Sequence, residues 1–158
     1  MESRDEGAKL KEMVQWPEFH NGAAAAFKIA FGQKKIAHQT RNWIMYHKPS
    51  QPKFEHGGFL LAVGLLGQLD TLHQTDMYQH LKTSHEATAV GMLLGRAASK
   101  IGTMEDQDTR TLCIHIPYLL PPSLSIDISL TIQSAAVFGA GLLYKGTSNR
   151  LMTEMLLA

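Results

Sequence analysis

Small residues recur in apolar segments at four places along the chain. Each segment begins and ends with Gly or Ala four positions apart, in the pairs Gly22 and Ala26, Gly58 and Ala62, Gly91 and Gly95, and Ala135 and Gly139. The first residues of these pairs are 36, 33 and 44 positions apart, a spacing typical of stacked helical repeats. Positions i and i+4 share one face of an α-helix. The pattern therefore predicts four helices, each with a strip of little side chain against which another helix can pack.

Glycine is an unfavourable residue inside a helix, where it costs about 1 kcal/mol relative to alanine. The expected helices repeat this cost several times, at Gly58, Gly64, Gly91, Gly95, Gly139 and Gly141. Dense packing against neighbouring helices can offset it, because protein interiors approach crystal density and many small contacts add up. A single such segment fits an ordinary core helix equally well, whereas four at similar spacing favour a repeat.

The residues between the strips predict a second helix after each one. Helices are expected at about 21–31, 39–46, 58–70, 75–82, 86–100 and 132–144, with a less regular one after Thr103 and a last one after Thr147 or Ser148. Residues 112–116 and 123–131 alternate in polarity, so the former could finish extended and the latter could lie as an extended loop. The expected organisation is a polar, poorly ordered arm over residues 1–13 and repeats over about 20–53, 54–85, 86–131 and 132–158.

Several polar residues are expected at helix starts. His20 and Asn21 precede the first strip and His56 precedes the second, where an imidazole or amide can bond to free backbone groups. Pro17 should discourage helix just before them. Thr83 and Glu86 have the T-x-x-E spacing of a capping box. These assignments give the residues a structural role.

Composition and charge limit the cellular compartments and the classes of binding partner that fit this chain. The formal charge is +1, which does not indicate charge-driven binding of nucleic acid or of an acidic membrane. The apolar runs are shorter than the roughly 20 residues that span a bilayer, and the first residues lack the apolar run of a secretory signal. Cys113 is the single cysteine, and we expect a buried apolar residue in a soluble intracellular protein rather than a catalytic thiol.

Motifs for chemistry are missing from the sequence. His73, His80 and His85 form the densest histidine group, but no Cys or carboxylate stands at a zinc-ligand spacing. Neither a nucleophile elbow, a phosphate-binding loop nor a dinucleotide fingerprint is present. The sequence therefore predicts no catalytic residue, no metal and no cofactor.

The helix pairs resemble a known repeat family. The similar sequences are WPEFHNG (16–22), HGGFLLAVGL (56–65), VGMLLG (90–95), GTM (102–104) and GLLY (141–144), together with the connecting WIMY (43–46), KP (48–49) and HIP (115–117). From residue 14 to the last residue, the chain resembles the proteasome/cyclosome repeats of the anaphase-promoting complex subunit 1 family, closest to its plant-type form. The scaffold subunits of the proteasome regulatory particle share this type of repeat but not the connecting segments.

This resemblance implies a fold and a function. The fold is all-α, an α-α superhelix of helix-turn-helix repeats that forms part of a toroid. The function is a non-catalytic scaffold segment of the ubiquitin ligase that marks cell-cycle regulators for destruction at the metaphase/anaphase transition. The implied partners are the other subunits of that complex and the rest of subunit 1, and the implied location is the nucleus and cytoplasm.

Two further expectations come from the residues alone. The last helix is apolar at Leu151, Met152 and Met155 through Leu157, and with no capping element after it this helix could mediate self-association. The alternative function is a free-standing helical domain that binds an apolar ligand, or an enzyme without a recognisable motif. A cavity on which His73, Tyr78 and Tyr144 converge would favour that alternative.

Overall fold

The computed structural model describes residues 2–32, 41–124 and 126–157, and every regular element in these ranges is a helix. The α-helices are α1 (Glu2–Gly32), α2 (Arg41–Tyr46), α3 (Phe54–Leu65), α4 (Gln74–Leu81), α5 (Glu86–Ser99), α6 (Asp106–Ile114), α7 (Leu130–Leu143) and α8 (Arg150–Leu157). Two short 3₁₀ helices, η1 (Gln68–Thr71) and η2 (Pro117–Leu119), follow α3 and α6. The prediction of an all-α fold is confirmed.

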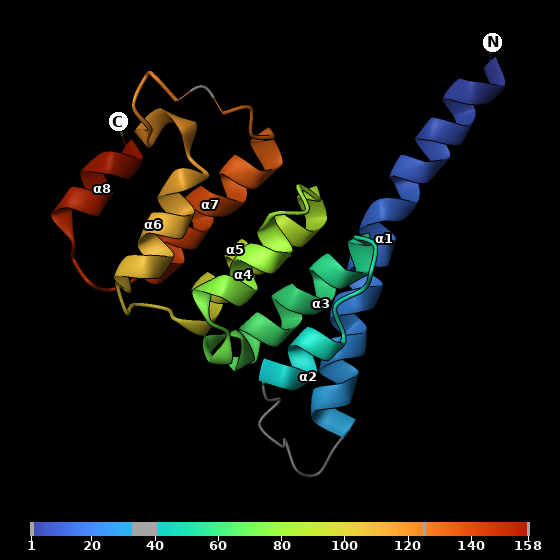
Figure 1. Cartoon of the computed structure of the whole chain (residues 1–158), viewed down its shortest axis with the longest axis horizontal. Coiled ribbons are helices and arrows are strands. Elements are labelled where there is room, and N and C mark those ends of the chain that lie inside the picture. The colour runs from blue at the N-terminus through green and yellow to red at the C-terminus, as the bar shows by residue number, and fades with distance from the viewer. Residues whose placement is uncertain (1, 33–40, 125, 158) are drawn as a thin grey trace.

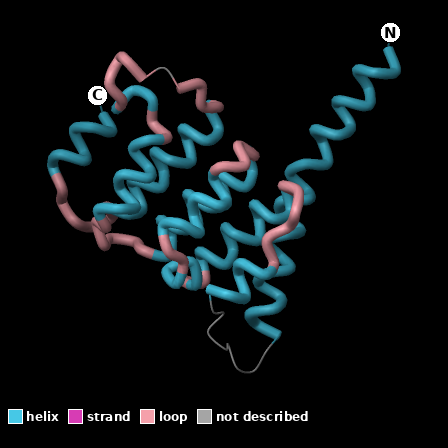
Figure 2. Tube along the Cα trace, in the orientation of Figure 1, coloured by secondary structure: helices cyan, strands magenta, loops and turns pink. Residues whose placement is uncertain are grey.

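The helices form two layers (Figures 1 and 2). In the first layer α1 packs on α3, α3 on α5 and α5 on α7. The second layer consists of α2, α4, α6 and α8, each of which follows a first-layer helix along the chain. This consecutive packing of helical hairpins is an α-α superhelix, as the sequence predicted.

Two groups of buried apolar side chains lie between the layers. One joins α1 to α5 and contains Ala26, Ile44, Leu60, Ala62, Val63, Leu69, Leu72, Met77 and Met92. The other joins α5 to α8 and contains Leu93, Leu112, Ile116, Ala136, Ala140, Leu143 and Met152. Each hairpin therefore completes its core only by stacking on the next one, as expected of a repeat architecture.

The first helix differs from the prediction. We expected a polar arm over residues 1–13 and a helix that begins near Asn21, but α1 runs without a break from Glu2 to Gly32 and contains Pro17. Proline removes one helical hydrogen bond, here to the carbonyl of Met13. Both residues are exposed, so water can solvate the carbonyl and the helix tolerates the proline.

The predicted helix starts at His20 and Asn21 are consequently wrong. Both residues lie inside α1 with exposed side chains. The buried residues around them are Phe19, Gly22 and Ala26, which share one face because they are three and four positions apart. His56 does lie in the first turn of α3, but the N-cap residue of that helix is Lys53.

Two caps were also assigned to the wrong residues. The N-cap of α5 is His85, whose Nδ1 accepts a hydrogen bond from the amide of Thr88 at 3.3 Å, so the expected capping box at Thr83 and Glu86 does not form. Asn149, rather than Thr147 or Ser148, accepts a hydrogen bond from the amide of Met152 at 2.9 Å at the start of α8. In both cases a ring nitrogen or amide oxygen serves in place of the expected hydroxyl.

Candidate functional site

The backbones of α1 and α3 are in direct contact at two glycines. A Cβ atom added to Gly22 would lie 2.6 Å from the carbonyl carbon of Glu55, and one added to Gly58 would lie 2.7 Å from that of Phe19. Ordinary contacts between carbon atoms are about 3.5–4.0 Å. Only glycine fits at these two positions without moving a helix.

The α3–α5 interface is built in the same way. A Cβ atom on Gly91 would lie 2.7 Å from the carbonyl carbon of Gly57, and one on Gly95 would lie 2.7 Å from the carbonyl oxygen of Leu60. A Cβ atom on Gly64 would collide with the backbone of Gly95. Gly57 and Gly58 thus face α5 and α1 respectively, so α3 is in backbone contact on two sides.

The α5–α7 interface is less close. A Cβ atom on Gly139 would meet side chains, at 2.7 Å from Cδ2 of Leu112 and 3.4 Å from Cβ of Ala97. Ala135 is buried beside it. A flexible side chain can move aside more easily than a backbone, so this contact depends less strictly on glycine.

All eight residues of the predicted small-residue strips are buried: Gly22, Ala26, Gly58, Ala62, Gly91, Gly95, Ala135 and Gly139. The strips did not include Gly57 and Gly64, which also contact backbone. Their seven-residue separation is two helical turns, the spacing that places residues on one face, and this spacing is the signal that could have identified them.

One face of α7 has no helix against it in the described structure. Leu130, Ser134, Val137, Phe138 and Gly141 are exposed, and their spacing of four, three, one and three positions places them on one side of the helix. Phe138 is 72% exposed, and nothing lies within 4 Å of a Cβ atom added to Gly141. This exposed face of α7 is largely apolar and, like the packed first-layer faces, includes a glycine.

The sequence predicts the free apolar face on α8 instead. That helix buries Met152 and exposes Leu151 and Leu157, while Met155 and Leu156 are half-buried. Part of α8 is therefore already used in the core between α5 and α8. The larger free apolar face belongs to α7.

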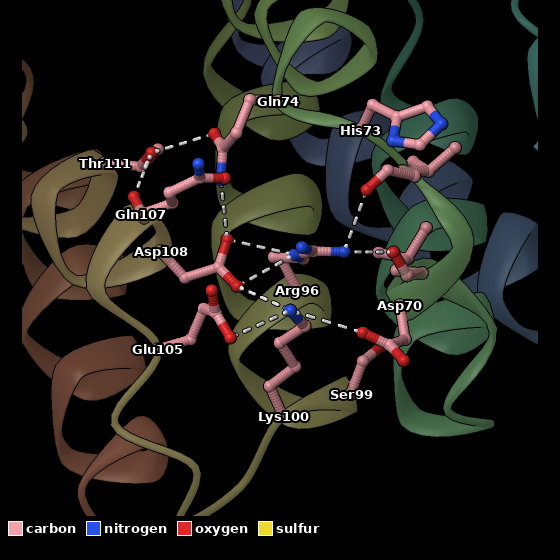
Figure 3. Close-up of polar contacts among 12 residues, drawn as sticks. Asp70, His73, Gln74, Arg96, Ser99, Lys100, Glu105, Gln107, Asp108 and Thr111 are labelled. Carbon is pink, nitrogen blue, oxygen red and sulfur yellow. Dashed lines mark hydrogen bonds and ion pairs between the residues drawn. The ribbon is translucent and has the colours of Figure 1, made fainter.

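A buried ion pair joins α5 to α6 (Figure 3). The Arg96 Nε donates to both carboxylate oxygens of Asp108 at 3.0 and 3.1 Å, and the two side chains are only 7% and 2% exposed. The guanidinium also donates from Nη1 to the carbonyl oxygens of Leu69 and Leu72 at 2.6 and 3.2 Å. Because the last two residues lie in and after η1, Arg96 connects three segments.

Further polar contacts extend this pair into a network (Figure 3). Lys100 Nζ lies 3.3 Å from Asp70, 3.6 Å from Glu105 and 3.5 Å from Asp108. Gln74, at the start of α4, donates to Asp108 at 3.1 Å. The network therefore ties the hairpin of α3 and α4 to that of α5 and α6.

The second-layer helices α2 and α4 are joined by a similar link. Arg41 donates two hydrogen bonds to the carboxylate of Asp76, one of them from Nη2 at 2.6 Å. These bonds hold the pKa of Asp76 below its usual value. Asp76 also accepts from the backbone amide of His73 at 3.0 Å at the start of α4. Side chains thus connect α2 to α4, whereas backbone contacts connect α1, α3 and α5.

The described residues do not assemble an evident reaction centre. Neither His73 nor Tyr144 lines the groove that Tyr78 lines, and the Tyr144 hydroxyl is hydrogen-bonded to Thr109 at 3.0 Å. His73, Tyr78 and Tyr144 therefore do not converge on one cavity. Burial raises the pKa of the Cys113 thiol, which disfavours the reactive thiolate.

Within the described ranges, His, Cys, Asp and Glu do not gather in a group of three that could hold a metal ion, and the helices are too short or too polar to cross a membrane.

Comparison with known proteins identifies relatives over nearly the whole chain. The model of the APC1 fourth domain matches residues 3–101, and that of the APC1 fifth domain matches residues 106–158. The boundary between the two matches falls in the connection between α5 and α6.

Three curated relatives are each named anaphase-promoting complex subunit 1. The human protein is 45% identical over 92% of this chain, the Dictyostelium discoideum protein 44% over 92%, and the Arabidopsis thaliana protein 38% over 94%. The aligned region makes up only 8%, 6% and 9% of these three relatives, respectively. Identity to the plant protein is the lowest of the three, so the comparison does not single out a plant-type form.

Proposed function

The chain belongs to the anaphase-promoting complex subunit 1 family, and on this basis we propose that it is a non-catalytic scaffold segment of the anaphase-promoting complex. In that role it would position other parts of a cell-cycle ubiquitin ligase rather than carry out a reaction. The observation that supports the proposal most directly is the close stacking of the first-layer helices at Gly22, Gly58, Gly91 and Gly95. Such packing fixes the angle between neighbouring hairpins, which is the property that a scaffold requires.

The proposed repeats cover residues 20–53, 54–85, 86–131 and 132–158. The last three ranges each contain one first-layer helix and one second-layer helix, whereas α1 begins at Glu2, before the first range. The third repeat is longer because it includes the connection between η2 and α7. The described residues of this connection form no helix or strand, and residue 125 lies outside the described ranges. In repeat arrays such insertions lie in loops, often on the binding face.

The proposed partners are the other subunits of the complex and the rest of subunit 1, in the nucleus and cytoplasm. The exposed face of α7 supports this part of the proposal, because large apolar side chains such as Phe138 are exposed on it. A further helix could approach closely at Gly141 and cover Phe138. Without such a helix, the same face would promote self-association of the chain.

Affinity capture from dividing cells tests the proposal. The tagged chain should co-purify with subunits of the anaphase-promoting complex, identified by mass spectrometry with defined reference peptides. A Phe138→Asp variant, which places a charge on the exposed face of α7, should lose them. The matched control is Tyr118→Asp, since Tyr118 is 75% exposed in η2 and lies outside that face. Retention of every subunit by the Phe138 variant would show that this face does not contribute, and capture of none by the unmodified chain would refute the scaffold role.

A further inference from the structure

A cavity lies beside the second hairpin, apart from the helix interfaces described above. It has a volume of about 420 Å³, within the size range of ligand-binding pockets. Its walls come from the linker between α2 and α3, the first turn of α3, the end of α4 and the start of α5. The lining residues are Met45, Lys48, Pro49, Ser50, Pro52, His56, His80, Lys82, Thr83 and Thr88.

The charged residues of this wall are both cations. Lys48 and Lys82 line the cavity, and the wall contains no carboxylate. Within the described part of the chain, neither lysine forms an ion pair; Lys48 donates to the carbonyl oxygen of Gln79 at 2.7 Å. Burial and the charge of Lys82 lower the pKa of Lys48. Two unneutralised cations on one cavity favour a negatively charged occupant.

A buried histidine adds an unpaired polar atom. His80 is 1% exposed, and its Nε2 is the buried side-chain nitrogen or oxygen that lacks a hydrogen-bond partner among the described residues. Its Nδ1 lies 3.3 Å from Nε2 of His56. When His56 donates in this contact, Nε2 of His80 carries a proton and is a free donor. Buried polar atoms are nearly always paired, and His80 is one of the residues that line the cavity, so its unpaired nitrogen suggests a missing partner.

The wall also carries three hydroxyl groups. Ser50 is exposed, whereas Thr83 donates to the carbonyl oxygen of His80 at 2.8 Å and the Thr88 hydroxyl is hydrogen-bonded to Nδ1 of His85 at 2.9 Å. Met45, Pro49 and Pro52 supply apolar surface around these groups. The cavity therefore has room for an anionic group and for the carbon atoms that carry it.

We propose that this cavity binds an oxyanion, a phosphate or carboxylate group carried by a peptide segment, with Lys48, Lys82 and His80 as the recognising residues. Both lysines would contribute charge, because ammonium groups form strong charge-assisted hydrogen bonds to oxyanions. This site is independent of the scaffold proposal, which does not require it.

Titration of the 158-residue chain with inorganic phosphate, with acetate, and with sodium chloride at matched ionic strength tests the site. The readouts are the ring nitrogen signals of His80 and His56 in NMR spectra. We expect a saturable shift with phosphate, acetate or both, and only a weak linear change with chloride. Saturation by phosphate alone assigns the site to phosphorylated segments, and saturation by acetate assigns it to acidic side chains; either supports the proposal.

Lysine variants test whether the anion binds in this cavity. Lys82→Gln should weaken binding about tenfold. Among the described residues the Lys82 side chain forms no ion pair or hydrogen bond, so the fold should persist. Lys48→Gln should have a similar effect, with circular dichroism as a check of folding. Lys145→Gln, at an exposed position outside the cavity, is the matched control and should bind normally. The proposal is overturned if no anion saturates the signals, or if the Lys82 and Lys145 variants respond alike.

Discussion

Replacement of Gly91 by alanine should loosen the contact between α3 and α5. The new Cβ atom would lie 2.7 Å from the carbonyl carbon and 2.9 Å from the Cα atom of Gly57, against an ordinary separation of about 3.5–4.0 Å. The two helices must therefore separate by about 1 Å, because the obstructing atoms belong to a backbone. Overpacking of this kind typically costs about 1–3 kcal/mol, and the upper part of that range applies because no side chain can rotate away.

Alanine also favours the helix itself, by about 1 kcal/mol relative to glycine. The net effect of Gly91→Ala should thus be a loss of about 2 kcal/mol in the free energy of unfolding. The matched control is Gly141→Ala, since nothing lies within 4 Å of the added Cβ atom. That variant should gain up to about 1 kcal/mol from helix propensity alone.

Thermal unfolding of the 158-residue chain, followed by circular dichroism, measures both effects. For a chain of this size each kcal/mol shifts Tm by about 2–4 °C. Gly91→Ala should therefore lower Tm by about 4–8 °C, and Gly141→Ala should raise it by up to about 4 °C. The reasoning is refuted if Gly91→Ala raises Tm as Gly141→Ala does, since the helices would then have room for a methyl group.

Three further predictions follow from the buried groups and from α1. Asp108→Asn should lower the free energy of unfolding by about 3 kcal/mol in urea titrations, because it leaves the buried guanidinium of Arg96 without its counterion. The control Arg150→Ala, in an exposed ion pair, should have no measurable effect. Equal effects of the two substitutions would show that the buried ion pair does not stabilise the fold. Burial lowers the pKa of His56 to about 3 and that of His80 to about 4, so the unfolded chain takes up protons at higher pH than the folded chain does. The stability that the two neutral histidines contribute should therefore be complete above about pH 6.5 and should fall as the pH drops toward 4, by about 1.4 kcal/mol per pH unit for each histidine. NMR titration of either ring near pH 6.5 would contradict this prediction. Pro17→Ala should increase helix content and stability by about 1–3 kcal/mol because Pro17 is exposed, and a loss of stability would show that the proline is needed.

The sequence predicted the hairpins because their signals are local. Four small-residue strips, each within five positions, sufficed to place α3, α5 and α7, and the turn residues between them placed α4 within one residue. The prediction at Pro17 is wrong because the rule against proline in helices does not include the solvation of the freed carbonyl. That solvation depends on which side of α1 faces water, and this is a property of the packed structure.

The buried polar contacts could not be predicted from the sequence. Arg96 stands in an apolar helix, and its partners are Asp108 and two carbonyl groups that reach it only after η1 folds back on α5. His56 and His80 are 24 positions apart, and no local pattern links them. Such pairs depend on how the hairpins stack, and a one-dimensional pattern does not contain that information.

Backbone contacts join α1, α3 and α5 in the first layer, whereas side-chain contacts join α2, α4 and α6 in the second. A methyl group added at one first-layer junction would change the angle between two hairpins slightly, and the displacement would grow with distance along the stack. A binding surface several hairpins away could then be misaligned although none of its own residues had changed.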